Sequence, residues 1–420
     1  MGKPIDKILV FEHQSITFQE GKRFYKEHFT KDIFEAFLSF HDRNPDTPFF
    51  DLIHNGVRFK SFVGAIQIGG VTIEVLPKIG KEDNPKVWHH VLLDMLKTCN
   101  LLQAKQSGKA NLKLRANSVL ELYFEMFLNE VELLLHQGFI KKYKKKKGQQ
   151  RSLKGALDFN RHISKNIVHK ELFYVSHTVY TKDHLLHQIL YEALLVISVI
   201  TNNSVITDKL RRIKSQFPEV SRLNIKASHF DRISESRKHQ PYEKAISIAQ
   251  LILLNYRPDI KAGRKNLLAI MFDMNRLWEE YVVRILKKNK PEDWLVMGQK
   301  SKPFWRSKSI RPDIVLKNKD QTFIIDTKWK VIHSEKPSDA DLKQMFVYNH
   351  YWDAKQSLLL YPNKGNQVSN PGAFTLPLKN NEIHSCQLAF VNVINDSGLN
   401  KNLASEIFNL LVVQEQSLKN

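Results

Sequence analysis

In the first hundred residues, short apolar runs suited to strands lie beside one helical pattern. The pattern of residues 8–11 indicates a strand, and residues 31–41 carry apolar positions at helical spacing. The turn pairs Asn55-Gly56 and Gly69-Gly70 supply the positive φ angles of tight hairpin turns. They separate three β-rich runs, at residues 49–54, 57–68 and 71–76. This part is therefore predicted to be mixed α and β, with a β-meander.

The middle of the chain is dominated by apolar residues at helical spacing. This spacing predicts helices over residues 87–99, 119–137, 183–200 and 242–254. Gly138 follows the second of them directly, at the position of a helix C-cap. We therefore expect a mostly helical middle region.

From about residue 265 onward, helical and strand patterns mix again. The spacing predicts a long helix over residues 267–286 and a second helix over residues 340–352. Short apolar runs typical of strands lie at residues 313–316, 322–326 and 357–361. This order of helices and strands is that of an α/β core.

These patterns divide the chain into three expected regions. A mixed α/β N-terminal domain covers residues 1–105, a mostly helical middle region covers residues 106–262, and an α/β domain covers residues 263–420. A chain of 420 residues is long enough for two or three such domains, each with its own core. No fixed-period repeat or low-complexity linker marks the boundaries.

The charge of the chain narrows the choice of partners. Lys and Arg number 64 against 43 Asp and Glu, which gives a net charge of +21. A polyanion such as nucleic acid suits this charge, because neutralised phosphates release their condensed counterions. A generally basic proteome or an anionic membrane surface would also account for it.

The densest basic run lies at residues 141–151. It is predicted to be a loop, either merely solvated or in contact with phosphates, with Tyr143 available to stack. The pattern leaves open whether the run would touch DNA or a protein partner. The candidate DNA-binding residues are Lys141, Lys142, Lys144, Lys145, Lys146, Lys147 and Arg151.

Other features exclude several classes of protein. The two cysteines, Cys99 and Cys386, have no metal-like spacing, which argues against a zinc finger or a disulfide scaffold. The sequence shows no secretory signal and no apolar run near the length of a membrane span. It also lacks a P-loop motif, so this chain is not a P-loop motor. We expect a soluble, cytoplasmic protein without membrane partners.

Residues 311–330 hold the arrangement with the most definite chemistry. Their pattern predicts a β-hairpin with its turn at residues 318–321. Asp313 opens the first strand, and Asp326 and Lys328 end the second. Because side chains alternate along a strand, Asp326 and Lys328 point the same way, and pairing across the hairpin can bring Asp313 close to both.

Two converging carboxylates suit Mg²⁺, which accepts a few oxygen ligands and keeps several waters. Asp313 and Asp326 are therefore candidate metal ligands. A bound metal would lower the pKa of a water, and Lys328 could orient that water and stabilise charge on a phosphate. This is the chemistry of phosphodiester hydrolysis. A surface salt-bridge cluster would place the same residue types together.

The motif Pro312-Asp313…Asp326-Thr327-Lys328 resembles that of the PD-(D/E)xK nuclease superfamily. More narrowly, the chain resembles the McrC family, the nuclease subunits of McrBC-type modification-dependent restriction systems. Segments outside the hairpin resemble the same family: residues 73–78, 153–157, 181–188, 273–282 and 341–348.

The resemblance adds Glu279, in the helix before the hairpin, and Gln344, in the helix after it, as catalytic candidates. Residues Asp341, Gln344 and Tyr348 share one helical face by their spacing. Each of these groups could equally be ordinary surface or core. His184 and His187 depart from the family pattern, where asparagines are expected, and are interpreted as structural.

The resemblance implies a restriction-endonuclease-like C-terminal domain that uses Mg²⁺ (or Mn²⁺) to cut DNA. It also implies a McrB-like, GTP-hydrolysing AAA+ ring as partner. That partner would recognise the modified cytosine in DNA, and the N-terminal part of this chain would dock on the ring and stimulate it. Two other hypotheses remain: a stand-alone repair or RNA-processing nuclease of the same superfamily, and a non-catalytic DNA-binding regulatory subunit.

Overall fold

The computed structural model describes most of the chain, which folds as two compact units. The described residues are 6–18, 29–43, 45–77, 79, 84–101, 118–234, 236–257, 266–319, 321–330, 332, 337–363, 367–375, 384–395 and 398–417. The first unit takes residues 1–5, 67–70 and 116–270, and the second takes residues 6–66, 71–115 and 271–420. The expected domain boundaries after residues 105 and 262 lie outside the described residues. So do Lys78, from one of the family segments, and residue 320, from the predicted turn.

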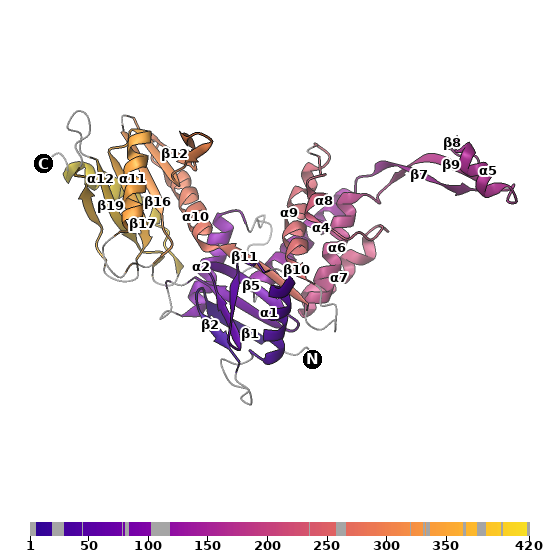
Figure 1. Cartoon of the computed structure of the whole chain (residues 1–420), viewed down its shortest axis with the longest axis horizontal. Helices are drawn as coiled ribbons and strands as arrows, with labels where there is room; N and C mark the ends of the chain where they lie inside the picture. Colours follow the sequence, from indigo (N-terminus) through magenta and orange to yellow (C-terminus); the bar gives the residue numbers. More distant parts are fainter. Residues whose placement is uncertain are drawn as a thin grey trace. The chain divides into compact units, whose positions relative to one another are not determined.

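Helices make up most of the first unit (Figure 1). The predicted helices are confirmed as α4 (Val119–Gln137), α6 (Leu185–Ile200) and α9 (Glu243–Asn255). Three further elements were not predicted: α7 (Ser204–Gln216), α8 (Ala227–Phe230) and the turn η3 (Gln240–Tyr242). Most residues of α4 are buried, and α4 packs against α7 and α9. Gly138 caps α4 with φ of 84°, as predicted.

A long antiparallel ribbon belongs to the first unit and carries the basic run (Figure 1). Strand β7 (Lys142–Gln150) pairs with β9 (Phe173–Thr181), which also pairs with β8 (Ala156–Leu157). Helix α5 (Phe159–Asn166) lies at the far end of the ribbon.

The prediction of a loop at residues 141–151 is therefore wrong, because β7 takes up nearly all of this run. The residues of β9 that face the lysines are uncharged or histidine, and they are Thr181, Val179, Thr178, His177 and Ser176. Without like charges opposite one another, the basic residues do not prevent strand pairing. The lysine side chains remain at the surface, where water solvates them.

His187 is fully buried at the base of the ribbon, in the structural role expected for it. Its Nδ1 donates to the carbonyl oxygen of Lys182 at 2.6 Å, so Nε2 of the neutral ring accepts from the Tyr242 hydroxyl at 3.0 Å. The ring stacks on Phe139, with centroids 4.5 Å apart. Burial, together with the nearby His184 ring, lowers the pKa of His187 to about 3. The fold thus requires a neutral His187.

This requirement predicts that acid weakens the first unit. The folded-state pKa lies below that of an unfolded histidine, so the stabilising effect is present above about pH 6.5 and is lost as the pH falls toward 3. Going from pH 7 to pH 5, we expect the His187 contribution to the free energy of unfolding to fall by about 2 kcal/mol. Urea unfolding of wild type and His187→Asn at both pH values measures this contribution to the free energy of unfolding. An equal pH dependence in the two proteins would contradict the assignment.

The predicted β-meander is divided between two sheets. Strands β1 (Asp6–Phe11), β6 (Val71–Leu76) and β5 (Phe62–Ile68) are neighbours in a sheet of order β1-β6-β5-β11-β10, which β11 (Leu267–Asp273) and β10 (Tyr256–Arg257) complete. Strands β2 (Ser15–Thr17), β4 (Gly56–Phe59) and β3 (Phe50–Ile53) form the other. The run predicted as one strand is thus divided between β4 and β5.

Two helices of the second unit lie at their predicted positions. Helix α1 (Lys31–Arg43) buries Phe37 edge-on against Phe50 of β3, with ring centroids 4.8 Å apart. Helix α2 (Pro85–Thr98) begins after Asn84, whose side chain accepts from the Lys86 amide.

The predicted helix over residues 267–286 is wrong in its first part. Residues 267–273 form β11, and helix α10 (Met274–Asn289) begins only after it. The first five residues of β11 are buried without alternation, which is typical of a strand covered on both faces. Asp273 ends this strand and caps the helix, because its carboxylate accepts from the amides of Asn275 and Arg276.

A six-stranded sheet forms the C-terminal part of the second unit, in the order β12-β15-β16-β17-β19-β18. Its predicted strands are confirmed: β15 (Ile314–Asn318), β16 (Gln321–Thr327) and β17 (Gln356–Pro362). The others were not predicted: β12 (Trp294–Gly298), β18 (Asn370–Ala373) and β19 (Ser385–Val391). Two small pairs of strands complete the unit. Strand β13 (Lys302–Trp305) pairs with β14 (Lys308–Ile310), and β20 (Ile394–Asn395) pairs with β21 (Gly398–Leu399).

Helices cover both faces of this sheet, so the fold is mixed α/β, as expected. On one face, Met345 of α11 (Asp339–Trp352) packs in a buried cluster with Ile324 of β16. On the other face, Phe323 stacks on Trp294, which contacts Phe408 of α12 (Leu403–Ser417). Adjacent residues of one strand thus face opposite helices. None of the described helices is long and apolar enough to cross a membrane.

Candidate active site

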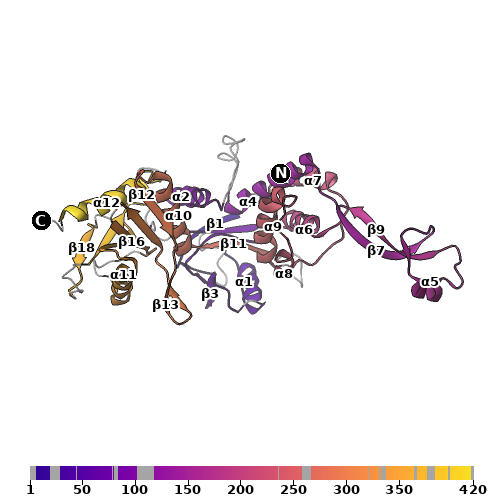
Figure 2. The same ribbon diagram turned by 90° about the horizontal axis from the view of Figure 1, so that it is seen from above.

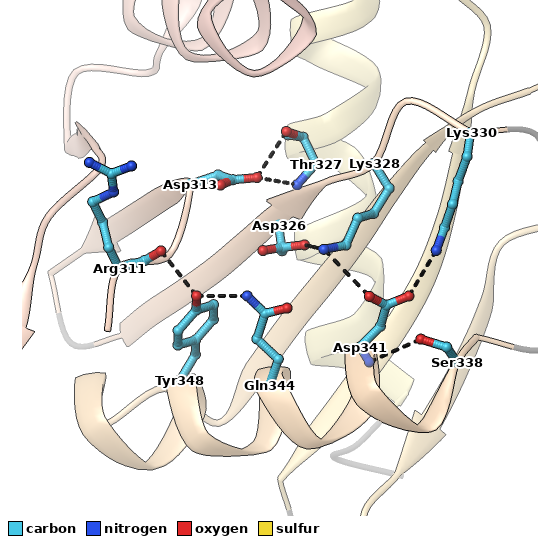
Figure 3. Close-up of polar contacts among 10 residues, drawn as sticks. All are labelled: Arg311, Asp313, Asp326, Thr327, Lys328, Lys330, Ser338, Asp341, Gln344 and Tyr348. Carbon is cyan, nitrogen blue, oxygen red and sulfur yellow. Dashed lines mark hydrogen bonds and ion pairs between the residues drawn. The ribbon is translucent and has the colours of Figure 1, made fainter. Parts of the chain in front are cut away.

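The β15–β16 hairpin brings Asp313 beside the end of β16. The antiparallel register pairs Ile314 with Ile325. Asp313 and Asp326 are therefore the next residues along the two paired segments of the hairpin. Asp313 Oδ2 accepts two hydrogen bonds from Thr327, one from the amide at 2.7 Å and one from Oγ1 at 2.9 Å. These bonds hold the Asp313 carboxylate against the end of β16 (Figure 3).

Asp326 and Lys328 point toward each other at the same end of the sheet (Figure 3). Lys328 Nζ lies 2.7 Å from Asp326 Oδ2, and Asp326 is only 2% exposed. The backbone of Lys328 is also fixed, because its amide donates to the carbonyl oxygen of Leu360 in β17 at 2.9 Å. The predicted convergence of Asp313, Asp326 and Lys328 is therefore present in the structure.

Asp341 is a second carboxylate partner of Lys328, at 3.4 Å, and the sequence analysis did not include it among the site residues. Its other oxygen pairs with Lys330 at 3.0 Å, and its amide is capped by the Ser338 hydroxyl. The sequence does contain an indication that Asp341 belongs to the site, since the helical spacing places it on the same face as Gln344. The lysine is thus held between two carboxylates from different elements.

Burial and neighbouring charges change the pKa values of all three converging groups. Burial raises the pKa of Asp326 to about 6, and the negative charge of Asp313 acts in the same direction. Burial also raises the pKa of Asp313, although hydrogen bonds from Thr327 oppose the change. Burial disfavours the charged form of Lys328, but the carboxylates of Asp326 and Asp341 outweigh it and raise its pKa. Lys328 therefore stays protonated at neutral pH.

The two aspartates fit a divalent cation such as Mg²⁺. Among the residues that the structure describes, Oδ1 of each carboxylate has neither a hydrogen-bond nor an ion-pair partner, and the buried Oδ2 of Asp326 has only its ion pair with Lys328. Burial is the main cause of the raised pKa of Asp326, and repulsion by the Asp313 charge adds to it; a nearby cation would offset both effects. Within the described ranges, no group of three or more His, Cys, Asp or Glu side chains could hold a metal. Two carboxylates are enough for Mg²⁺, which keeps several waters.

Glu279 of α10 lies in the electrostatic neighbourhood of Asp313. Its Oε1 accepts from Gln299 Nε2 at 2.5 Å, and the Gln299 amide donates to the Asp313 carbonyl oxygen at 2.8 Å. Burial raises the pKa of Glu279; the Gln299 hydrogen bond opposes the shift, and the charge of Asp313 adds to it. The structure thus connects Glu279 to the backbone that carries Asp313.

Gln344 connects to the same segment from the other side, through Tyr348. Gln344 Nε2 donates to the Tyr348 hydroxyl at 2.7 Å, and that hydroxyl donates to the Arg311 carbonyl oxygen at 3.0 Å (Figure 3). Tyr348 therefore has a polar role as well as a packing one. The pair fixes the chain two residues before Asp313.

The residue after Lys328 makes a buried contact with Glu12, the residue that follows β1. The indole of Trp329, the next residue, donates to Glu12 Oε1 at 2.7 Å, and Glu12 is 1% exposed. The Trp329 ring also packs against Trp278 of α10, with centroids 5.3 Å apart. No local pattern in the sequence relates Glu12 to Trp329, so this contact was not predictable from it.

The basic residues predicted to bind DNA belong to the ribbon of the first unit. Lys144 pairs there with Asp183 at 3.2 Å. Lys141 lies over the Tyr180 ring, 5.7 Å from its centroid, and Tyr180 packs on Tyr143. They belong to a different unit from Asp326, and their contact with DNA stays a prediction.

Fold and site together define a mixed α/β protein with a buried carboxylate and lysine cluster at one end of a sheet. The family model of the McrBC 5-methylcytosine restriction system component matches residues 57–362. This match spans more than half of the chain. The chain belongs to the McrBC 5-methylcytosine restriction system component family.

A similar solved structure agrees with this at the level of the fold. A chain of the refined half-complex from the tetradecameric assembly of Thermococcus gammatolerans McrB AAA+ hexamers with bound McrC matches with a TM-score of 0.68 and 19% identity, covering 96% of this chain and 100% of that chain. A chain of the cryo-EM structure of the Thermococcus gammatolerans McrBC complex matches with a TM-score of 0.49 and 19% identity, covering 68% and 88%. No curated protein matches the sequence.

Proposed function

We propose that this chain is the DNA-cutting subunit of a McrBC-type restriction system. Its C-terminal part would be a PD-(D/E)xK restriction-endonuclease-like domain that hydrolyses phosphodiester bonds. The observation that supports this best is the convergence of Asp313, Asp326 and Lys328 at the end of one hairpin. Membership in the McrBC family supplies the restriction context.

In this proposal, Asp313 and Asp326 would hold Mg²⁺ (or Mn²⁺) through their carboxylates. When bound, the ion would supply an acidified water and neutralise charge on the phosphate. Thr327 keeps Asp313 oriented through its two hydrogen bonds, so that the two carboxylates need little rearrangement on binding.

Lys328 acts as a hydrogen-bond donor and a cation, because its raised pKa keeps it protonated. From its place beside Asp326 it orients the attacking water and stabilises the negative charge that builds up on the phosphate. The water oxygen bonds to phosphorus as the water loses a proton to solvent. The bond from phosphorus to the leaving sugar oxygen breaks, and that oxygen takes up a proton from solvent. Glu279 and Gln344 position the segment that carries Asp313.

The partner in this proposal is a GTP-hydrolysing AAA+ ring that recognises modified cytosine and is stimulated by this chain. The solved structure with the higher TM-score is described as McrB AAA+ hexamers with bound McrC, which supports such an assembly. The absence of a P-loop motif from this sequence also favours a separate motor. Docking through the N-terminal region and a cytoplasmic location belong to the same proposal.

Cleavage of methylated and unmethylated DNA tests the proposal. The full chain is combined with Mg²⁺ or EDTA, and with or without a McrB-type partner and GTP. We expect cutting that requires Mg²⁺, the partner, GTP and the methylated DNA. Cutting by the chain alone would point to a stand-alone nuclease. An absence of cutting under every condition, with DNA binding retained, would favour the non-catalytic subunit.

Glu12 provides a more specific prediction, because it holds the residue after Lys328. Glu12→Ala removes the acceptor of the Trp329 indole and is expected to lower the rate constant of cutting about tenfold or more. Glu12→Gln keeps an acceptor oxygen and should retain most of the rate. Single-turnover cleavage at saturating DNA checks both. Equal losses in the two variants, or a loss confined to DNA affinity, would contradict a positioning role.

A further inference from the structure

The β13–β14 hairpin of the second unit stands out from the six-stranded sheet (Figure 2). Trp305 pairs with Lys308, so the turn between the strands has only two residues, Arg306 and Ser307. Arg306 adopts φ of 48°, in the left-handed region. This conformation favours Gly or Asn over Arg, so the turn itself does not call for an arginine.

Trp305 at the end of β13 is exposed, which is unusual in this protein. The chain has six tryptophans, and the other five are buried. Trp305 is 60% exposed and the neighbouring Phe304 is 48% exposed. The Arg306 guanidinium lies over the Trp305 ring, 4.8 Å from its centroid. The hairpin thus presents a flat aromatic ring and a cation together at its tip.

The segment that contains this hairpin is strongly basic. Residues 300–311 contain five basic residues and no Asp or Glu. The basic residues are Lys300, Lys302, Arg306, Lys308 and Arg311. In the part of the chain that the structure describes, none of them forms an ion pair with a carboxylate. The charge of Arg311 does favour the ionised forms of Asp313 and Glu279. Positive charge that no ion pair neutralises, next to an exposed aromatic ring, is suited to nucleic acid.

The base of the hairpin is fixed to α11. Lys302 Nζ donates to the Tyr351 carbonyl oxygen at 2.5 Å and lies over the Trp352 ring, 5.1 Å from its centroid. The Phe304 ring packs on Tyr351, with centroids 5.6 Å apart. Lys302 and Phe304 therefore seat the hairpin, while Trp305, Arg306 and Lys308 remain available to a ligand.

The hairpin leads directly into the candidate active site. Only two residues separate Ile310, the last residue of β14, from Asp313. Even a fully extended chain spans at most about 11 Å over three residues. The end of β14 therefore lies about three nucleotide steps or less from Asp313. A DNA strand held at Asp313 and Asp326 would pass close to it.

We propose that the β13–β14 hairpin is a DNA-binding guide of this site, a role that rests on the proposed function. Lys308, Arg306 and Arg311 bind phosphates beside the one that is cut. Trp305 packs against a base or sugar of the same strand, with Arg306 on its ring. The hairpin thereby sets the position of the strand over Asp313.

Binding to a fluorescent DNA duplex, measured by anisotropy in EDTA with the full chain, tests this proposal without cleavage. Trp305→Ala and Arg306→Asn are each expected to weaken binding about tenfold. The Asn variant suits the φ at position 306 and should fold at least as well as wild type. The pair Arg306→Ala and Lys308→Ala should lower the slope of log affinity against log salt by about two.

The matched control removes two exposed lysines at the end of α10, Lys287 and Lys288. This control variant has the same net charge as the double hairpin variant. It should keep the part of the DNA affinity that depends on the hairpin, and its slope of log affinity against log salt should equal that of wild type. A second readout is tryptophan fluorescence. Because Trp305 is the exposed tryptophan, DNA should protect the fraction of fluorescence that acrylamide quenches.

Unchanged DNA affinity in the hairpin variants would overturn the proposal. So would normal DNA affinity with reduced stimulation of the partner's GTP hydrolysis, since the surface would then belong to a protein contact. If the variants bind DNA weakly while wild type never cuts, the hairpin assignment stands and the proposed nuclease function fails. The two proposals are therefore separable.

Discussion

Asp326→Asn is expected to abolish DNA cutting and, in metal-free buffer, to stabilise the protein. A metal ligand contributes several kcal/mol to transition-state stabilisation, so single-turnover cleavage should fall about 1000-fold or more. The asparagine has nearly the same shape but no charge. Loss of cutting in a better-folded variant would separate catalysis from stability.

The stability effect follows from the pKa of Asp326, which burial and Asp313 raise to about 6. An acid whose pKa is higher in the folded state destabilises the fold as the pH rises through that value. Above about pH 7, the asparagine should therefore raise the free energy of unfolding by about 1 to 3 kcal/mol, and at pH 4 the difference should vanish. Urea unfolding in EDTA at both pH values measures this.

Asp293→Asn is the matched control, because Asp293 is an exposed aspartate of the same unit that pairs with Lys319. It should leave cleavage and the pH dependence of stability unchanged. If Asp326→Asn cut DNA normally, the proposed site would be wrong. If Asp326→Asn were less stable than wild type at pH 8, the repulsion between Asp326 and Asp313 would not be the dominant charge interaction of Asp326.

Lys328→Met is expected to lower the cleavage rate about 100- to 1000-fold, the effect of removing one donor from a charged transition state. Lys328→Arg should lose most of this rate as well, because a planar guanidinium differs in shape and reach from an ammonium. Wild-type cleavage should not decline between pH 7 and 9, since the pKa of Lys328 is raised and the amine stays protonated.

Lys330→Met is the control for this variant. Lys330 also pairs with Asp341 but is half exposed, so its loss should have only a small effect on the rate. Single-turnover rates of the three variants between pH 6 and 9 provide the comparison. A rate that rises as Lys328 loses its proton would mean that the lysine acts as a base and not as a donor.

The core of the site was predictable because its geometry is local. Side-chain alternation along one strand places Lys328 beside Asp326, and a tight hairpin brings Asp313 to them. The periodicity of α11 likewise indicated which side chains share its face, including Asp341. None of these steps required knowledge of distant contacts.

The other features depended on contacts that a local pattern does not contain. The apolar residues at the start of β11 fit a helix by spacing, and only burial on both faces made them a strand. The lysines of β7 suggested a loop, until the uncharged partners in β9 allowed pairing. Glu12 contacts Trp329 across 317 residues of sequence.

That separation also affects the order of events during synthesis on the ribosome. Residues 6–66 and 71–115 emerge early but share their compact unit with residues 271–420. At about 5 to 20 residues per second, Glu12 waits roughly 15 to 60 s before Trp329 is made. A nascent chain, or one cut short by a premature stop codon before Asp326, contains no assembled site. Synthesis from the N-terminus thus delays any cutting activity until the chain is nearly finished.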